Sequence, residues 1–364
     1  MAEDSQTRGN IGEWSELLAL ATLLVNGGAY SANEKQEPIR DLYLKVLQVV
    51  VLSQEQNSEL KYEINEDVVK ISENNVIVDT VSRDTIKKQL DFFFQDLTSG
   101  AGKKTFSIPS GKKLMDLLHK KNISASSRER ETDISLVIAD TDTGGSTPRF
   151  GFSIKSQLGA RSTLLNASAA TNFVFKIVAN DLSVKNKYPE FQHGKHRQNL
   201  KLLYESGYHL EFKNLANQTF FSNLTLLDMQ FPDYLARVLL NSYLSGEDSF
   251  SENTYQVFAR DLDKSRQPIF KLKEFLGAVA MGLRPSKPWD GDTTKFRGII
   301  VIKHDGDVLF YYLQNRKNFE EHLFSNLTFE RPSTTRHNYG RIYSQDGEDL
   351  IKLNLQLRFK SRRG

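Results

Sequence analysis

Apolar positions recur along the chain with two different periods, and these periods assign most of the expected helices and strands. From Gly12 to Asn26 they recur every three or four residues, which predicts an amphipathic helix that ends at the following pair of glycines. The same spacing predicts further helices over 84–97, 112–119 and 269–281, one that begins near Pro232, and short ones through Phe173 and over 320–324.

Runs of β-branched residues and apolar–polar alternation predict the strands. They cover 76–81, 133–139, 149–155, 298–304, 307–313 and 351–359. Residues 41–52 fit either a helix or a strand, and three valines at 49–51 favour a buried strand at the end of this stretch. The acidic, polar stretch over 53–75 is expected to form solvated surface. Together these elements predict an α/β fold, with a mixed β-sheet flanked by helices.

The strands over 133–139 and 149–155 are expected to form one hairpin, because DTDTGGST between them has the composition of a turn. If the chain folds back near Gly144, Asp133 faces the neighbourhood of Ser153 and Lys155. Cross-strand Cβ atoms lie about 4.5–5.5 Å apart, and residues two apart on a strand point to the same face. The three polar side chains are therefore expected to meet on one face of the sheet.

This layout is similar to that of the PD-(D/E)xK nucleases. In those enzymes an acid at the mouth of one strand holds Mg²⁺, and a lysine on the neighbouring strand orients or activates the attacking water. Ser153 occupies the position of the second acid, and no other acid follows Lys155 until Asp181. An Asp and a Lys on adjacent strands are also common as a solvated pair, so the spacing alone is a weak signal.

Two glutamates of the first predicted helix are candidates for the missing acid. Glu13 and Glu16 lie three residues apart and so are neighbours on the helix surface. The simpler explanation is that acids in a first turn complement the helix dipole. However, Glu13 falls on the apolar side of the helix and Glu16 at its edge, and a buried carboxylate needs a partner or a metal. In many PD-(D/E)xK enzymes a first-helix glutamate binds the metal, and we expect one of these two to do so.

Longer segments resemble the HpaII-type type II restriction endonucleases. They are GNIGEWSELLALATLL, GFSIKSQLGARSTLLNASAATNF, and RPSTTRHNYGRIY with IKLNLQLRF. The likeness runs along nearly the whole chain in the same order, which makes it far more specific than an Asp-to-Lys spacing. It implies a PD-(D/E)xK restriction-endonuclease-like core with helical insertions, and Mg²⁺-dependent, site-specific cleavage of double-stranded DNA.

The same resemblance implies roles for particular residues and partners. Asp133 binds the metal, Glu13 or Glu16 completes its shell, and Lys155 positions the water. Ser153 stands in the carboxylate position and Gln157 orients the site. The target resembles the palindrome CCGG, cut to leave short 5′ overhangs, which makes a homodimer on DNA the simplest arrangement. A cognate DNA methyltransferase of the same restriction-modification system acts on that site without having to bind this protein.

Composition narrows the class of protein. The 364 residues carry a formal net charge of +3, which is only mildly basic, so local basic clusters matter more than bulk charge. The absence of cysteine excludes disulfides and thiol nucleophiles and fits a reducing cytoplasm. The resemblance to restriction endonucleases implies that the cell is prokaryotic. No secretory signal is visible, and the longest apolar runs are too short to span a bilayer. We therefore expect a cytoplasmic protein without membrane contact.

Candidate DNA contacts lie in the loop after Lys155, in the basic stretch 185–201, in the polar loop 331–341 and at the start of the returning hairpin strand. Arg and Asn side chains suit guanine and adenine edges, and basic loops suit phosphates. The candidates are Arg161, Ser162, Asn166, Asn172, Arg149, Lys195, Arg197, Arg331, Arg336 and His337. A capped loop would explain Asn166 without DNA, but it leaves Arg161 unexplained.

Two other functions remain open at this point. One is a structure-selective or nonspecific DNA nuclease of the same fold. The other is a non-catalytic DNA-binding protein built on a decayed nuclease, which the serine at 153 motivates. The chain is expected to form a single restriction endonuclease unit over 1–364. A subdivision into an N-terminal helical and α+β part, 1–105, and a catalytic and DNA-recognition part, 106–364, is conceivable from the glycine- and lysine-rich stretch between them.

Overall fold

The computed structural model describes residues 7–52, 58–99, 104–123, 132–140, 143–159, 161–181, 188–192, 194–259, 262–292 and 296–360. Internal contacts divide the chain into two compact units. The first contains residues 1–162 and 293–322, and the second contains residues 163–292 and 323–364. Each unit is thus built from two separate stretches of sequence. The single restriction endonuclease unit over 1–364, with or without a subdivision at residue 105, stays a prediction.

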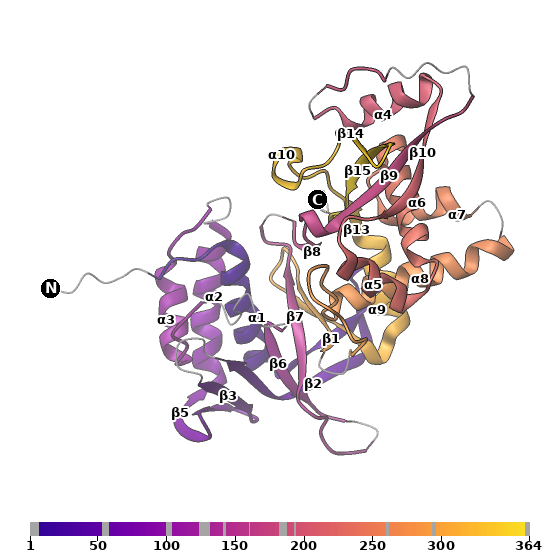
Figure 1. Ribbon diagram of the computed structural model, residues 1–364. Helices are drawn as coiled ribbons and strands as arrows, with labels where there is room; N and C mark the ends of the chain where they lie inside the picture. Colours follow the sequence, from indigo (N-terminus) through magenta and orange to yellow (C-terminus); the bar gives the residue numbers. More distant parts are fainter. Residues whose placement is uncertain are drawn as a thin grey trace. The chain divides into compact units, whose positions relative to one another are not determined.

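Three helices of the first unit pack side by side: α1 (Ile11–Asn26), α2 (Arg83–Ser99) and α3 (Pro109–Leu117) (Figure 1). Helix α1 begins at a capping box, in which the Asn10 side chain accepts from the Glu13 N–H while the Glu13 carboxylate accepts from the Asn10 N–H. It ends at Gly27, whose φ of 72° is left-handed. The predicted first helix and its glycine stop are confirmed.

The first unit contains a nine-stranded mixed sheet in the order β1-β12-β11-β7-β6-β2-β3-β4-β5. The strands are β1 (Gly28–Ala32), β2 (Pro38–Leu52), β3 (Glu59–Ile64), β4 (Val68–Glu73), β5 (Val76–Ser82), β6 (Ile134–Ile138), β7 (Phe150–Ser156), β11 (Phe296–Ile302) and β12 (Val308–Tyr312). Strand β7 runs parallel to β11, and β1 runs parallel to β12, whereas the other neighbours are antiparallel. The predicted α/β fold with a mixed sheet is confirmed.

The long strand β2 closes a ring. Its first part pairs with β1, and its last part pairs with β6 and β3. Strands β1, β12, β11, β7, β6 and β2 therefore return on themselves, and β3, β4 and β5 extend the sheet beyond β2. The strands of the predicted hairpin, β6 and β7, are both members of this ring. Strand β7 also pairs with β11, and β6 also pairs with β2.

The core of the first unit lies between α1 and the sheet. Trp14, Leu17, Phe152 and Ile300 are fully buried in one cluster. The indole Nε1 of Trp14 donates to the Phe106 carbonyl at 3.1 Å, so its polar atom is satisfied. Each such side chain contributes about 1.5–3 kcal/mol on burial. The apolar residues of α1 therefore hold that helix firmly against β7.

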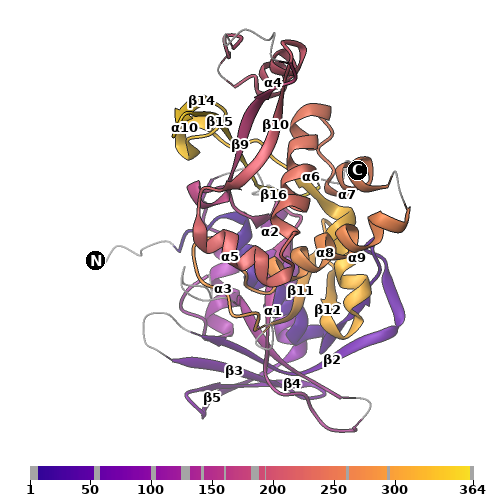
Figure 2. The same ribbon diagram turned by 45° about the vertical axis from the view of Figure 1, so that its right-hand side comes forward.

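The second unit has two smaller sheets, ordered β10-β9-β15-β14 and β13-β16-β8. The strands are β8 (Thr163–Leu165), β9 (Asn172–Ala179), β10 (Tyr208–Leu215), β13 (Leu327–Phe329), β14 (Ile342–Gln345), β15 (Glu348–Asn354) and β16 (Leu357–Phe359). Its helices are α4 (His196–Glu205), α5 (Gln218–Leu227), α6 (Phe231–Ser245), α7 (Phe250–Phe258), α8 (Leu262–Ala280) and α10 (Thr334–His337), with the 3-10 turn η1 (Ala169–Thr171). Helix α4 lies beside one end of the β9–β10 ribbon (Figure 2).

The remaining elements follow β12. They are η2 (Leu313–Asn315) and α9 (Arg316–Asn326), and the division between the units falls inside α9. In the described part of the chain, no helix has both the length and the apolar character needed to cross a membrane.

The helix predicted through Phe173 is wrong, because residues 172–179 form strand β9. Ser168 does cap a helical turn, but only the short η1, by accepting from the Ala170 N–H at 3.2 Å. Phe173, Val174 and Phe175 are buried in succession. Such a continuous apolar run fits a buried strand as well as a helix, and periodicity alone cannot separate them.

Two other predictions also need correction. The polar stretch over 53–75 contains strands β3 and β4, whose Leu60, Tyr62, Val69 and Ile71 are buried while charged residues alternate with them. Residues 53–57 lie outside the described part. The last predicted strand, 351–359, is divided into β15 and β16. In the first case a polar composition, and in the second one long alternation, conceals the turn that separates two short strands.

Acid is expected to weaken the sheet of the second unit through Glu348. Lys176 of β9 and Lys213 of β10 both pair with Glu348 of β15, and these bonds lower the carboxyl pKa from its ordinary 4.5 to about 2. A lowered folded-state pKa means that this stabilisation is present above pH 4.5 and is lost as the pH falls toward 2. We expect Glu348→Gln to be less stable than wild type at pH 7 and to lose less stability between pH 4.5 and 2. Urea denaturation at each pH measures this.

The matched control is Glu205→Gln, which removes a surface carboxylate of α4 that lies 3.7 Å from Lys201. Its unfolding should follow the wild-type dependence on pH closely, because exposed helix pairs contribute little. An identical acid response of Glu348→Gln and wild type would contradict the assignment.

Candidate active site and nucleic-acid surface

The β6–β7 hairpin fixes the position of Asp133. Ile134 pairs with Phe152, so Asp133 lies across from Ser153, as predicted. The Asp133 N–H donates to the Phe152 carbonyl at 3.1 Å, and its Oδ2 accepts from the Ile154 N–H at 2.6 Å. The backbone of β7 therefore holds this carboxylate at the entrance to β6.

Ser153 and Lys155 project to one face of β7, because they are two residues apart on a strand. Ser153 is buried and Lys155 is half-buried. Gln157 continues the ladder by donating its N–H to the Ile302 carbonyl at 2.9 Å, and its side-chain Nε2 donates to Gln36 Oε1 at 2.7 Å. The Gln157 amide is thus anchored two residues beyond Lys155.

Helix α1 meets the end of β7 through small residues. The Ser15 and Ser156 hydroxyls are 2.8 Å apart, and the Ser15 hydroxyl also donates to the Ile11 carbonyl at 2.6 Å. Gly159 lies so close to α1 that a Cβ on it would be 2.1 Å from Ile11 Cγ2. Glu16 is the residue after Ser15 on α1. Its backbone is therefore next to the Ser15–Ser156 contact with β7, the strand that carries Lys155.

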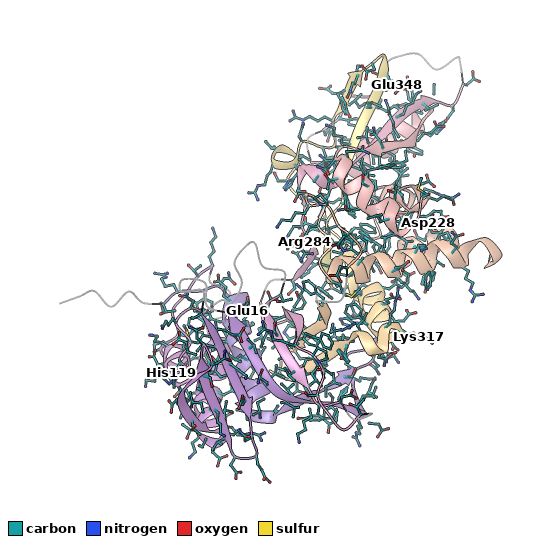
Figure 3. The ribbon with its side chains drawn as sticks, turned by 60° about the horizontal axis from the view of Figure 1, so that its bottom comes forward. Glu16, His119, Asp228, Arg284, Lys317 and Glu348 are labelled. Atoms are coloured by element: carbon teal, nitrogen blue, oxygen red, sulfur yellow. The ribbon has the colours of Figure 1, made fainter. Side chains whose placement is uncertain are left out.

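The two first-helix glutamates have different surroundings. Glu13 Oε2 accepts from the Asn10 N–H at 2.7 Å and is engaged in the helix cap. Glu16 is labelled in Figure 3. It lies within electrostatic reach of Lys120, which is almost completely buried. Burial lowers the pKa of Lys120 to about 8, and the negative charge of Glu16 opposes that shift. The cap explains Glu13 without a metal, whereas Glu16 has a cation beside it.

Two candidate donors, Asp133 and Glu16, have the chemistry that suits a hard divalent cation. Asp133 and Glu16 are carboxylates on separate elements, and no group of three or more His, Cys, Asp or Glu able to hold a metal occurs among the described residues. Zinc sites usually need three or four protein ligands, whereas Mg²⁺ is often bound by one or two carboxylates, waters and substrate phosphates. Two carboxylates of this kind would form only a partial set of ligands, which waters and a phosphate substrate would have to complete.

Substitution at Gly159 is expected to disturb this arrangement. Gly159→Ala places a methyl group against Ile11, and such overpacking costs about 1–3 kcal/mol. We expect a lower melting temperature and reduced DNA cleavage, because α1 must shift away from the end of β7. Ile11→Ala alone removes the obstructing side chain, so the double variant should recover part of both losses. Unchanged melting and cleavage in Gly159→Ala would show that the approach is not tight.

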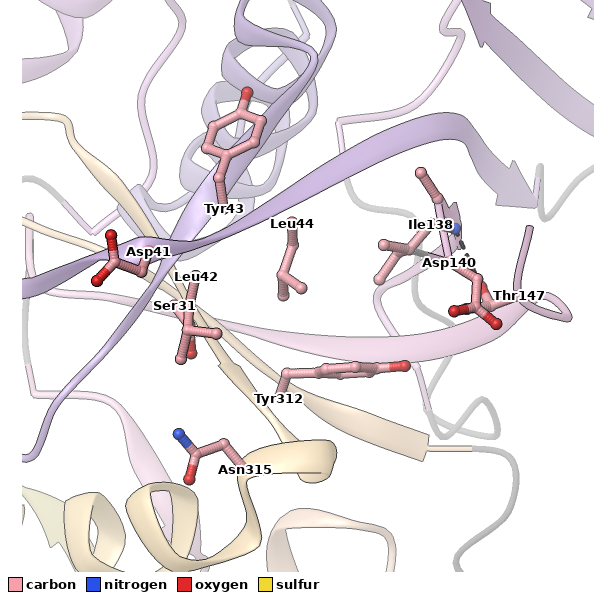
Figure 4. A pocket seen from close by; sticks show the side chains of 11 residues that line it. Ser31, Asp41, Leu42, Tyr43, Leu44, Ile138, Asp140, Thr147, Tyr312 and Asn315 are labelled. Atoms are coloured by element: carbon pink, nitrogen blue, oxygen red, sulfur yellow. Dashed lines mark hydrogen bonds between the residues drawn. The ribbon is translucent and has the colours of Figure 1, made fainter. Parts of the chain in front are cut away.

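A pocket of the first unit lies elsewhere. It measures about 510 Å³ and is lined by residues of β1, β2, β6 and β12, including Asp41, Tyr43, Ile138 and Tyr312 (Figure 4). Ile138 is at the end of β6, whereas Asp133 precedes the start of that strand. The Ile138 N–H donates to Thr147 Oγ1 at 3.1 Å beside the pocket. None of the candidate catalytic residues lines it.

The DNA candidates of the first unit differ in how far they are engaged. Arg149 pairs with Glu59 at 2.6 Å, and the Ser162 hydroxyl donates to the Ser156 carbonyl at 2.9 Å. Arg161 is exposed and makes no hydrogen bond or ion pair with another described residue. Arg161 is therefore the candidate in this unit with the most freedom to contact DNA. Arg128 and Arg130, which precede Asp133 in sequence and could reach phosphate, lie outside the described residues.

In the second unit, two candidates serve the protein itself. Asn172 is 2% exposed, its Nδ2 donates to the His337 carbonyl at 2.9 Å, and its Oδ1 accepts from Asn354 at 2.7 Å. Arg331 donates to the Ser242 carbonyl at 2.8 Å and lies 4.0 Å over the Tyr243 ring. Both side chains are used in internal bonds, so we do not retain them as base contacts.

The other candidates of the second unit reach the surface. Asn166, Lys195, Arg197 and Arg336 are exposed, and His337 is half-buried. Arg197 donates to the Leu244 carbonyl at 3.3 Å. Burial and the neighbouring Arg336 lower the pKa of His337, so its ring favours the neutral form.

Sequence reasoning missed Lys120 and Gln36. Lys120 belongs to a basic stretch, and nothing in its sequence neighbourhood distinguishes it from the exposed lysines around it. Its Nζ donates to the Ile123 carbonyl at 2.8 Å, and this burial follows from the loop after α3. Gln36 contacts Gln157 across 121 positions of sequence. No local pattern reports a contact of that range.

Comparison with known proteins gives a family match over nearly the whole chain. The family model for the HpaII restriction endonuclease matches residues 10–359. The chain is also similar to the Type II restriction enzyme HpaII of Haemophilus parainfluenzae, with 35% identity over 361 residues. That alignment covers 96% of this chain and 98% of the relative. No solved structure gives a significant match.

Proposed function

Because the chain belongs to the HpaII restriction endonuclease family and is a type II site-specific deoxyribonuclease, we propose that it cuts both strands of duplex DNA at a CCGG-like palindrome with Mg²⁺. DNA is its partner, and enzymes of this type use divalent metal ions. The observation that carries the proposal is the β6–β7 hairpin. This hairpin holds the Asp133 carboxylate against the β7 backbone, across from Ser153. Lys155 follows Ser153 by two residues on the same strand.

The proposed catalytic roles follow from side-chain chemistry. Asp133 and Glu16 supply the carboxylate oxygens for the metal, and we assign Glu16 rather than Glu13 because Glu13 caps α1. Lys155 donates a hydrogen bond to the attacking water and keeps it in line with the scissile phosphate. Ser153 contributes a neutral hydroxyl where related nucleases carry an acid. Gln157, anchored by Gln36, orients the end of β7.

A bound Mg²⁺ would supply Lewis-acid polarisation of the phosphate and a lower pKa for a coordinated water. The protein's own contribution is positional. The Ile154 N–H holds the Asp133 carboxylate in position. The positive charge of Lys120 balances part of the negative charge of Glu16, and the Ser15–Ser156 contact holds α1 at the end of β7. These contacts keep the acidic groups in place before substrate arrives.

Recognition of the target is assigned first to Arg161. A CCGG site exposes guanine O6 and N7 in the major groove, and arginine pairs with both in a bidentate contact. The exposure of Arg161 and its lack of a partner among the described residues support this role. Lys195, Arg197, Arg336 and His337 of the second unit are assigned to phosphate or base contacts, with Asn166 as a further polar contact.

A palindromic target suggests a homodimer, because a two-fold axis in the protein would match the two-fold axis of the site. A cognate methyltransferase would protect the same sequence in the host. DNA as substrate and the absence of cysteine support a cytoplasmic location in a prokaryotic cell.

Digestion of unmethylated phage DNA with Mg²⁺ tests the proposal. Discrete bands whose mapped ends lie at CCGG support it, and EDTA should abolish them. Discrete bands at another sequence would contradict the assigned target. A smear would point to nonspecific or structure-selective cutting. Intact DNA that nevertheless binds the protein would favour the non-catalytic alternative, for which Ser153 in place of an acid is the motivating observation.

A further inference from the structure

Two segments that carry candidate DNA contacts, the basic stretch 185–201 and the polar loop 331–341, meet around one pocket of the second unit. The pocket measures about 270 Å³. Phe191 and His196 from the basic stretch line it together with Tyr339 and Arg341 from the polar loop 331–341. Residues 202–330 separate the two segments in sequence, so neither could suggest the other. The pocket is near the lower end of the roughly 300–1,000 Å³ typical of ligand sites, which suits a single ring system.

The pocket contains stacked aromatic rings. The His196 and Tyr339 rings are 5.1 Å apart with an interplanar angle of 26°, and Tyr339 is 2% exposed. Tyr339 donates its hydroxyl to the Pro332 carbonyl at 2.6 Å, which fixes its ring. A Cβ at Gly340 would lie 2.7 Å from the His196 ring, so the glycine makes room for this stack. The outer ring, His196, is half-buried and therefore partly accessible.

A rigid polar network supports the loop that carries Tyr339 and Arg341. Asn354 donates to Asn172, and Asn172 donates to the His337 carbonyl. The Gly340 N–H donates to the Lys352 carbonyl at 2.8 Å. These bonds tie the loop to β9 and β15, so the pocket is formed before DNA arrives.

We propose that this pocket binds one nucleobase of the target DNA, extruded from the duplex and stacked on His196. This inference rests on the proposed function, because it assumes that the two basic segments face DNA. Base edges in a major groove are read by side chains that project into the groove, whereas a concave site receives a group that projects from the duplex. Only an extruded base or a backbone phosphate does so.

The lining favours the base. Aromatic rings stack on every nucleobase, and each stack is worth a measurable part of the affinity. Arg341 is exposed at the rim and can donate to the base edge. The Gly340 N–H is already bonded, so it is not offered to a phosphate. Lys195, the N-cap of α4, has no side-chain cap bond and lies next to His196, where it suits the phosphate of the same nucleotide.

The test measures binding to duplexes of the mapped target without divalent metal, by fluorescence anisotropy. In successive duplexes the partner of each base is replaced by an abasic site, which lowers the cost of extruding that base. We expect one position to tighten wild-type binding about 10-fold. His196→Ala should lose this gain, whereas His196→Phe, which keeps a stacking ring, should retain it. Gln198→Ala, on the exposed surface of α4 outside the pocket, is the matched control and should also retain it.

Three results would overturn the inference: no position tightens binding, His196→Ala keeps the full gain, or His196→Ala weakens all duplexes equally. The last would mark a phosphate contact, since a backbone contact does not depend on the base. Cleavage of the target by wild type with Mg²⁺ is measured in parallel. If cleavage is normal but no abasic position tightens binding, the base-binding role of the pocket is wrong and the proposed function still holds. If the target is not cleaved, the proposed function is contradicted. The binding measurements on the abasic duplexes then still show whether the pocket binds a base.

Discussion

Lys155→Ala protein is expected to bind its target DNA and leave it uncut. Lys155 projects from β7 on the same face as Ser153, across from the entrance to β6 where Asp133 is held by the Ile154 N–H. Removing a charged donor from a hydrolytic site typically lowers the rate by about 10²–10³-fold. Its carbonyl and N–H remain in the ladder with Val301, so the sheet is preserved. Single-turnover cleavage and filter binding on the same preparation measure the two properties separately.

Lys45→Ala provides the matched control for charge. Lys45 is an exposed lysine of β2 in the same unit, and its loss changes net charge by the same amount. We expect it to cut at nearly the wild-type rate. If Lys155→Ala cuts within a few-fold of Lys45→Ala, Lys155 has no catalytic role. If Lys155→Ala binds no DNA, its role is in affinity rather than in chemistry.

Glu16→Gln is expected to lower cleavage about 10²-fold or more, whereas Glu13→Gln should stay close to wild type. Glutamine at 13 can still bond to the Asn10 N–H, so the capping box survives. Glutamine at 16 keeps the volume of the side chain but removes the charge that faces Lys120 and is proposed to bind the metal. The two variants differ by one turn of the same helix and share the same chemical change. Cleavage rates over a series of Mg²⁺ concentrations measure the effect.

Loss of metal binding must be separated from loss of folding. Calorimetric titration of the enzyme–DNA complex with Ca²⁺ reports the metal site without cleavage, and thermal denaturation reports the fold. We expect Glu16→Gln to lose Ca²⁺ affinity and to melt slightly earlier, because the buried Lys120 loses its counter-charge. The reverse ranking, with Glu13→Gln inactive and Glu16→Gln active, would reassign the ligand to Glu13.

The strongest local signals gave the correct elements. Gly27 ends α1, the segment DTDTGGST separates β6 from β7, and the Asp305-Gly306 dipeptide lies between the predicted strands that became β11 and β12. Each depends on the few residues that make the turn or cap. The placement of Asp133 in the neighbourhood of Ser153 and Lys155 followed from this local geometry, and the structure adds the register.

What the sequence could not predict depends on distant contacts. Asn172 looked like a base-reading residue, but its amide is used by His337 and Asn354. The burial of Lys120 and the meeting of His196 with Tyr339 join segments that no periodicity connects. Phe173 shows the other limit, since a continuous apolar run does not reveal whether it forms a helix or a central strand.

The parallel pairing of β7 with β11 has a consequence for the connection between them. Parallel neighbours cannot be joined by a tight turn and need a crossover of a dozen or more residues, usually one helix. Here the chain leaves after β7, builds most of the second unit over 163–292, and returns to start β11. Each doubling of such a connection adds only about 0.6 kcal/mol of closure entropy. Changes in the length of this crossover therefore cost little stability, and the β6–β7 hairpin keeps its pairing when they occur.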